Sequence, residues 1–237
     1  TTFIWHYIPL YGVVIAFKDY KVIDGILGSD WAGLEHFMAF FRDPYFEPIL
    51  WNTIRISLYS FATFPCSIIF ALMINELTNH KFKKTVQMIS YMPHFISTVV
   101  VCAMVHMFFN VDGGIVNNVI VALGGEPVPF MYKAKYFDHL YVWSGVWQGI
   151  GWGTIIYLAN LSNVSPDLIE AARIDGASRW DVVVHINIPT ILPTVVIMLI
   201  LRVGSIMGVG FEKVFLLQTD LNLSASRVIS TYVYERT

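Results

Sequence analysis

Long apolar runs alternate with short polar segments along the whole chain. The runs cover roughly residues 3–17, 49–74, 86–109, 140–161 and 191–209. A helix that crosses the hydrocarbon core of a bilayer needs about 20 predominantly apolar residues. The pattern therefore predicts five membrane helices. Because the chain starts with Thr1 at the edge of the first run, we expect it to be a truncated piece of a longer protein.

The first long polar segment, residues 18–48, contains an amphipathic pattern. Leu34, Phe37, Met38 and Phe41 recur at helical spacing, and charged side chains fall between them. Such a helix lies either at the membrane interface or on the outer rim of the protein itself. We expect residues 1–48 to form a membrane helix followed by this extracytoplasmic segment, and residues 49–237 to form the main membrane domain.

Prolines and glycines modify the predicted membrane helices. Pro65, Pro93 and Pro193 fall within or at the start of a run and predict kinks. In the fourth run, Gly145, Gly149 and Gly153 form a stripe of small residues along which another helix can approach closely. Trp143 and Trp147 point away from this stripe by helical angle.

Composition restricts the class of protein. Hydrophobic residues make up 56 % of the chain and charged residues only 14 %, so part of the surface must face lipid. The formal net charge of −2 gives no electrostatic basis for binding nucleic acid. Cys66 and Cys102 both lie in apolar runs, which favours free, buried thiols over a disulfide.

The apolar runs contain no Asp or Glu. The ionisable groups in or near the runs are His6, Arg55, His94, His106 and Arg202. The chain also lacks the phosphate-binding pattern GxxxxGK[ST], so any uphill transport must take its energy from another polypeptide.

Three residues are candidates for a solute path. Gln148 and Trp152 lie beside the glycine stripe, and Arg202 lies near the middle of the fifth run. An uncompensated cation at that depth costs at least ~2.5 kcal/mol, so Arg202 needs a partner. One interpretation is structural, with backbone carbonyls, Gln148 or another subunit as the partner. In the other, the three side chains line a pore and contact a sugar.

The polar insert at residues 162–189 has strong helix-capping signals. Ser165 and Pro166 suit the start of a helix, and Gly176 suits its left-handed end. Ser178 and Asp181 have the spacing of a capping box for a second helix. The density of Lys and Arg in this insert and in residues 75–85 favours a cytoplasmic location for both. An outside carboxyl end would then require a further membrane helix after Thr237.

The stretch EAARIDGASRWDVVVHINIP resembles the EAA motif of permease subunits of binding-protein-dependent ABC importers. Six of the motif's seven positions match, and Ile188 replaces the usual Leu at the seventh; the positions are Glu170, Ala171, Ala172, Gly176, Ile186, Ile188 and Pro189. The segment EAARIDGA, which includes Asp175, resembles the carbohydrate branch. Further stretches, among them QMISYMPHFIS and GWGTIIYLANL, are similar to permeases of lipoprotein-associated and complex-polysaccharide systems.

This resemblance implies an all-α polytopic membrane protein with the type I, MetI-like permease fold, without catalytic residues, metal or cofactor. The family's usual partners are a second permease subunit forming a heterodimer, two cytoplasmic ATPases and an extracytoplasmic solute-binding lipoprotein. The matched motif residues and Asp175 would couple to the ATPases. The expected location is the bacterial cytoplasmic membrane, and the expected solute is a sugar or oligosaccharide.

Two other classes of function stay open on residue pattern alone. One is an intramembrane metal-dependent enzyme that uses His94, Cys102 and His106, although Cys102 and His106 at helical spacing are more often a core pair. The other is a non-transporting scaffold whose polar insert recruits a cytosolic protein.

Overall fold

The computed structural model is mostly helical and describes residue 5 and residues 7–206 and 208–236. The chain divides into two compact units, Thr1–Ile49 and Leu50–Thr237, which are described separately. The boundary lies next to the predicted division at 48/49, and the roles assigned there to the two parts stay predictions.

The first unit combines short helices with a two-stranded antiparallel sheet. Its elements are η2 Ile8–Phe17, β1 Lys18–Asp19, α1 Gly25–Gly28, β2 Asp30–Trp31 and α2 Glu35–Arg42. The predicted amphipathic helix is therefore present as α2. Met38 and Phe41 on its apolar face are more than half exposed within this unit.

The predicted membrane helix at residues 3–17 is helical over its last ten residues, and its role as a span stays a prediction. Residues 8–17 form a 3₁₀ helix of 10 residues, which is about 20 Å long at ~2.0 Å per residue and so shorter than the bilayer core. Residues 1–4 and His6 lie outside the described part of the chain.

Helices α3 (Phe46–Ala62) and α4 (Phe64–Asn75) form a nearly continuous pair. The first turn of α3 belongs to the first unit, and the rest of the pair belongs to the second. The break at Thr63 precedes Pro65, which occupies the first turn of α4, as the proline pattern predicts. Together the pair forms one candidate membrane span, Phe46–Asn75.

The third apolar run is broken rather than straight. It comprises α5 His80–Tyr91, the short 3₁₀ helix η3 Met92–Phe95 and α6 Thr98–Phe109, with a bend of 102° between its two arms. Pro93 cannot donate the backbone hydrogen bond that would continue α5. Ser97 then caps a new helix, since its hydroxyl accepts a hydrogen bond from the Val100 N–H at 3.4 Å.

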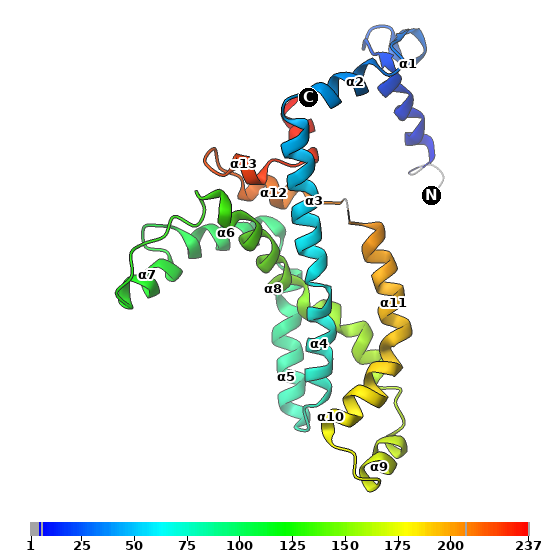
Figure 1. Ribbon diagram of the computed structural model, residues 1–237, viewed down its shortest axis with the longest axis vertical. Helices are drawn as coiled ribbons and strands as arrows, with labels where there is room; N and C mark the ends of the chain where they lie inside the picture. The colour runs from blue at the N-terminus through cyan, green and yellow to red at the C-terminus, as the bar shows by residue number, and fades with distance from the viewer. Residues whose placement is uncertain (1–4, 6, 207, 237) are drawn as a thin grey trace. The chain divides into compact units, whose positions relative to one another are not determined.

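Helix α8, Ala134–Leu161, is the longest helix of the described chain and lies at the centre of the second unit. Helices α4, α5 and α11 (Ile188–Gly204) pack against it (Figure 1). Pro193 lies inside α11, which continues through it. The polar insert forms α9 Pro166–Ile174, α10 Arg179–Val182 and the π-helical turn η4 Val183–Asn187.

The opposite end of the second unit is formed by α7 Ile115–Ala122 and by the tail, which contains α12 Phe211–Leu217, α13 Leu223–Ser226 and α14 Ile229–Arg236. Buried Cys102, Phe137, Val214 and Val228 belong to one core cluster that joins α6, α8 and the tail. Cys66 and Cys102 are free thiols, as expected, although Cys66 is only half-buried.

By length and composition alone, two to three candidate membrane spans are identified in the described residues, and the predicted number of five stays a prediction. Within the described residues, two helices qualify, Phe46–Asn75 and Arg179–Gly204, and the bent pair raises the number to three. Two of the five predicted helices are not among these candidate spans. Helix η2 is short, and α8 carries polar residues such as Gln148 along its length.

Candidate functional site

The first helix of the polar insert ends at a glycine in the left-handed conformation. Gly176 has φ = +89°, and an added Cβ would meet nothing within 4 Å. The Gly176 N–H donates to the Arg173 carbonyl at 3.0 Å and the Ala177 N–H to the Ala172 carbonyl at 2.9 Å. This pair of hydrogen bonds is a Schellman motif, so the predicted glycine end of α9 is confirmed.

The second helix of the insert begins with the predicted capping box. The Asp181 N–H donates to Ser178 Oγ at 3.2 Å, and the Ser178 N–H donates to Asp181 Oδ2 at 2.9 Å. Ser165 occupies the N-cap position of α9, as predicted, but its side chain makes no capping hydrogen bond. Local sequence signals thus fix the α9–α10 segment, residues 165–182.

The α9–α10 segment presents large apolar side chains to the outside. Leu168, Ile174 and Trp180 are 53 %, 86 % and 70 % exposed. The motif residues are exposed except for Ala172 and Ile186, which are half-buried; the exposed ones are Glu170, Ala171, Asp175, Gly176, Ile188 and Pro189. An ordered, exposed surface of this kind suits a protein partner.

The segment connects directly to the membrane helices. A cavity of about 600 Å³ lies between the end of α4 and the residues that lead from α10 into α11. Beside it, buried Asn187 donates a hydrogen bond of 3.4 Å to Glu76 Oε1. Figure 1 shows α9 and α10 at the same end of the unit as the turn between α4 and α5. The two segments predicted to be cytoplasmic therefore lie together.

A cavity of about 590 Å³ with several polar side chains in its lining lies beside α8, bounded by α3, α4, α11 and α12. We call it the α8 cavity. Its hydrogen-bonding and charged side chains include Ser60, Ser67, Gln148, Arg202, Ser205 and Lys213.

The predicted glycine stripe forms one wall of the α8 cavity. Gly145, Gly149 and Gly153 all line it. A Cβ at Gly153 would lie 2.6 Å from Ser67 Oγ of α4, whereas one at Gly149 would meet nothing within 4 Å. The closest helix approach is at a glycine that the stripe omits: a Cβ at Gly151 would overlap the Ser90 carbonyl of α5. A Cβ at Gly145 would lie 3.0 Å from Lys213 Nζ, so of the three glycines only Gly149 faces open space.

The three sequence candidates for the solute path have different surroundings. Gln148 lines the α8 cavity, and its Nε2 donates to the Ile96 carbonyl at 2.8 Å, at the break between η3 and α6. Trp152 does not line the cavity; its ring stacks on His94 with centroids 4.3 Å apart. Gln148 therefore has a structural hydrogen bond as well as a place on the cavity wall.

Arg202 also lines the α8 cavity, but it does not lie mid-helix. Helix α11 ends at Gly204, so Arg202 is in its last turn, where the helix dipole favours a positive charge. Its Nη2 donates to the Ser60 carbonyl at 3.3 Å. A backbone carbonyl was one of the expected partners.

Lys213 is a charged residue of the cavity that sequence reasoning missed. It comes from α12, in the tail, where the local pattern gave no sign of its neighbours. Its Nζ donates to the Tyr141 carbonyl at 2.7 Å and lies 4.9 Å from the centre of the Tyr141 ring. Burial lowers the pKa of Lys213 from 10.5 to about 8.

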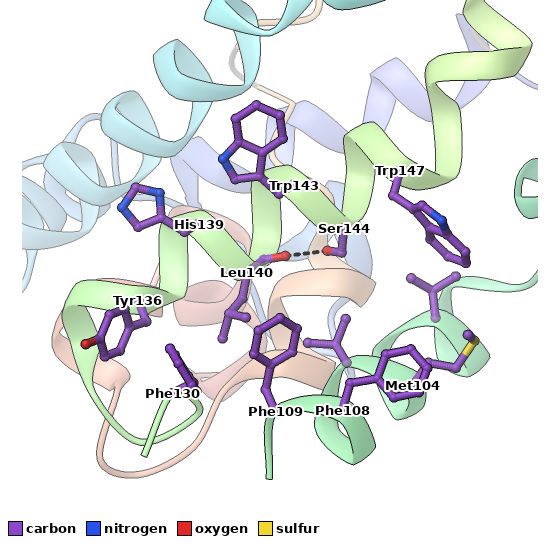
Figure 2. A pocket seen from close by; sticks show the side chains of 12 residues that line it. Met104, Phe108, Phe109, Phe130, Tyr136, His139, Leu140, Trp143, Ser144 and Trp147 are labelled. Atoms are coloured by element: carbon purple, nitrogen blue, oxygen red, sulfur yellow. Dashed lines mark hydrogen bonds between the residues drawn. The ribbon is translucent and has the colours of Figure 1, made fainter. Parts of the chain in front are cut away.

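A second cavity, of about 480 Å³, lies between α6 and α8 and is apolar. Figure 2 shows the aromatic rings that surround it, with Trp143 and Trp147 on α8 and Phe108 and Phe109 on α6. The two tryptophans point away from the glycine stripe, as predicted. The Ser144 hydroxyl donates within its own helix, to the Leu140 carbonyl. This cavity offers few free hydrogen-bonding groups to a sugar.

The metal-enzyme interpretation gains no support from the geometry. In the described residues, no three His, Cys, Asp or Glu side chains are grouped so that they could hold a metal ion. His106 Nε2 instead pairs with the Leu216 carbonyl at 3.0 Å.

Residues 63–235 match the family of binding-protein-dependent transport system inner membrane components. The polygalacturonan/rhamnogalacturonan transport system permease protein YteP of Bacillus subtilis (strain 168) is 42 % identical over 98 % of this chain and 72 % of its own. Protein LplB of the same organism is 40 % identical over 98 % of this chain and 73 % of its own.

Solved structures agree with this assignment. The crystal structure of a bacterial ABC transporter that imports the acidic polysaccharide alginate superimposes with a TM-score of 0.91 at 36 % identity, over 99 % of this chain and 79 % of its own. A second structure, in complex with an alginate pentasaccharide-bound periplasmic protein, gives 0.90 at 36 % identity, over 99 % and 78 %. The chain therefore belongs to the family of binding-protein-dependent transport system inner membrane components, and it is a transmembrane permease subunit rather than an enzyme.

Proposed function

We propose that this chain is one of two permease subunits of an ATP-driven importer of an oligosaccharide in the bacterial cytoplasmic membrane. A second, similar permease completes the pore as a heterodimer. Two separate cytoplasmic ATPases supply the energy, and an extracytoplasmic binding lipoprotein delivers the solute. Similarity to the polygalacturonan/rhamnogalacturonan permease and to the alginate transporter supports the saccharide class.

The observation that carries the proposal is the α9–α10 segment. It is fixed by its own caps, exposes Ile174 and Trp180, and continues through η4 into α11, which bounds the α8 cavity. An ATPase that binds Glu170, Gly176 and their neighbours would therefore act on a wall of that cavity. Movement of the segment on ATP binding would open the pore alternately to each side.

The proposal includes five membrane crossings: residues 3–17, the α3–α4 pair, the bent α5–α6 pair, α8 and α11. Helix α8 has 28 residues, which at ~1.5 Å per residue give about 42 Å, more than the bilayer core requires. In this arrangement Gln148 and Arg202 lie on the solute path, and Trp152 lies beside it.

The test replaces Gly176 by Val in the complete complex with both permeases, both ATPases and the binding protein. Val tolerates φ = +89° poorly, at a cost of about 1–3 kcal/mol, so the end of α9 should distort. We expect the ATPase activity stimulated by solute-loaded binding protein to fall about tenfold or more, with the subunits still assembled.

The chain offers a matched control. Gly124 has φ = +85°, and a Cβ there also meets nothing within 4 Å, but it lies in the loop after α7. Gly124→Val should leave stimulated ATPase activity near that of the wild type. If Gly176→Val also leaves it unchanged, the α9–α10 segment does not couple to the ATPases.

A further inference from the structure

The α8 cavity contains two cationic side chains that lack carboxylate partners. In the described residues, neither Arg202 nor Lys213 has a carboxylate within ion-pair distance. Arg55 is different, because its Nε lies 2.6 Å from Asp138 Oδ2. Arg227 of the tail likewise pairs with Glu235 at 2.9 Å, whereas the two cavity cations have no carboxylate partner among the described residues.

Lys213 is held in place without its charge being neutralised. Its ammonium group donates to the Tyr141 carbonyl at 2.7 Å and lies over the Tyr141 ring. A Cβ at Gly145 would lie 3.0 Å from Nζ, so the ammonium is next to the glycine wall of the cavity. An ammonium has three donors, so two N–H groups are left for a ligand.

Arg202 has similar spare capacity. Among the described residues it donates one hydrogen bond, to the Ser60 carbonyl, of the five that a guanidinium can donate. A smaller cavity of about 170 Å³ adjoins the α8 cavity and shares Ser60, Tyr141 and Arg202 with it. Arg202 therefore contacts both spaces.

The smaller cavity contains an unsatisfied hydroxyl. Ser57 lines it, is 7 % exposed, and its Oγ has no hydrogen-bond partner in the described part of the chain. Buried hydroxyls are normally hydrogen-bonded, so this one calls for a partner that enters the cavity. A sugar hydroxyl has the donor and acceptor character that it needs.

We propose that Lys213 and Arg202 bind the carboxylates of an acidic saccharide, one that contains uronate units, as it passes through the α8 cavity. The inference rests on the proposed function, since it assumes that the solute is a saccharide. Charge-assisted hydrogen bonds from ammonium and guanidinium to carboxylate are the strong contacts of such a site. At Gly149 the wall leaves a sugar ring room to come close to the α8 backbone.

The two cationic side chains are the feature of the cavity that favours an acidic solute over a neutral one. Hydroxyls and amides such as Ser57, Ser67 and Gln148 would suffice for a neutral sugar. In this chain Lys213 is half-buried and Arg202 is exposed. A solute that covers these cations removes them from water, at a free-energy cost that a carboxylate offsets and a neutral hydroxyl does not. The alginate transporter of similar fold imports an acidic polysaccharide, which agrees with this assignment.

The test compares uptake of acidic and neutral saccharides by the complete complex in proteoliposomes with its binding protein. The acidic probes are short oligomers of galacturonate and of mannuronate, and the neutral probes are their full methyl esters. Each initial rate for a variant is divided by the wild-type rate for the same saccharide, which cancels any preference of the binding protein.

We expect Lys213→Met to slow acidic uptake about tenfold and neutral uptake less than twofold, and Lys213→Arg to restore acidic uptake. The matched control is Lys135→Met: Lys135 also lies over a tyrosine ring, 4.7 Å from the centre of Tyr136, but it is exposed and outside the cavity. It should change neither rate.

Several results would overturn the inference. Equal losses for acidic and neutral probes in Lys213→Met, with assembly intact, would make Lys213 a structural lysine. Wild-type uptake of the esters alone would reject an acidic solute while the proposed function stands. If the wild-type complex takes up no probe and its ATPase does not respond to loaded binding protein, the proposed function fails first.

Discussion

The α9–α10 segment and the α8 cavity are built in opposite ways. Every feature that shapes the segment is local: the Schellman motif at Gly176 and the capping box at Ser178 join residues no more than five positions apart. The cavity is lined by residues from 60 to 213, and its Lys213–Tyr141 contact spans 72 positions. One region is fixed by its own sequence, and the other only by the packing of distant helices.

This difference predicts how each region responds to change. A substitution in the segment should cost about one capping interaction and leave the helical bundle intact. A substitution where the cavity helices meet should disturb several helices together, because close-packed interiors transmit strain.

The largest expected effect is therefore that of Gly151→Ala. The new methyl group would overlap the Ser90 carbonyl, so α5 and α8 must move apart, at a cost of about 3 kcal/mol, the upper part of the usual range for overpacking. We expect a lower thermal unfolding midpoint in detergent and a poorer yield of assembled complex. Gly149→Ala, two residues away in an open position, should leave both unchanged. A stable Gly151→Ala protein would show that the helices adjust easily.

The second-largest expected effect is a pH dependence of saccharide uptake, and it arises in the α8 cavity. With a pKa of about 8, Lys213 goes from roughly nine-tenths charged at pH 7 to roughly one-tenth charged at pH 9. Its charge is thus lost as pH rises, and the ratio of acidic to neutral saccharide uptake should fall about threefold to tenfold across that interval.

Other charged or titratable groups lie near Lys213 and could contribute to the pH dependence of the uptake ratio. The control must therefore test Lys213 alone. The groups on the surrounding helices are Cys102, His106, Tyr141, Arg202 and Glu212. Lys213→Arg leaves all of them in place and keeps a positive charge throughout the interval. The ratio should then be flat between pH 7 and pH 9. A profile that survives this substitution would assign the titration to one of the neighbours.

The same difference explains what could be predicted from the sequence. The glycine end of α9 and the capping box of α10 follow from short-range signals, and the structure confirms both. Similarity along the chain indicated the family correctly. The bend at Ser97, the early end of α11 after Arg202 and the approach of Lys213 to Tyr141 depend on contacts between distant segments, for which a run of apolar residues carries no signal. Hydropathy therefore gave no sign of the bend in the third run and missed a charge on the cavity wall.

The smallest effect is expected in the α9–α10 segment, from Ser178→Ala. This change removes the hydroxyl that accepts the Asp181 N–H, at a cost of about 1 kcal/mol, confined to α10. Ser165→Ala is its matched control, because Ser165 also stands at an N-cap but makes no side-chain capping bond. Hydrogen exchange of the Asp181 amide should speed up about fivefold in the first variant and stay unchanged in the second. Stimulated ATPase activity should fall about twofold in Ser178→Ala, with the unfolding midpoint of the complex unaltered. A lower midpoint would mean that the segment is tied into the bundle more strongly than its local hydrogen bonds indicate.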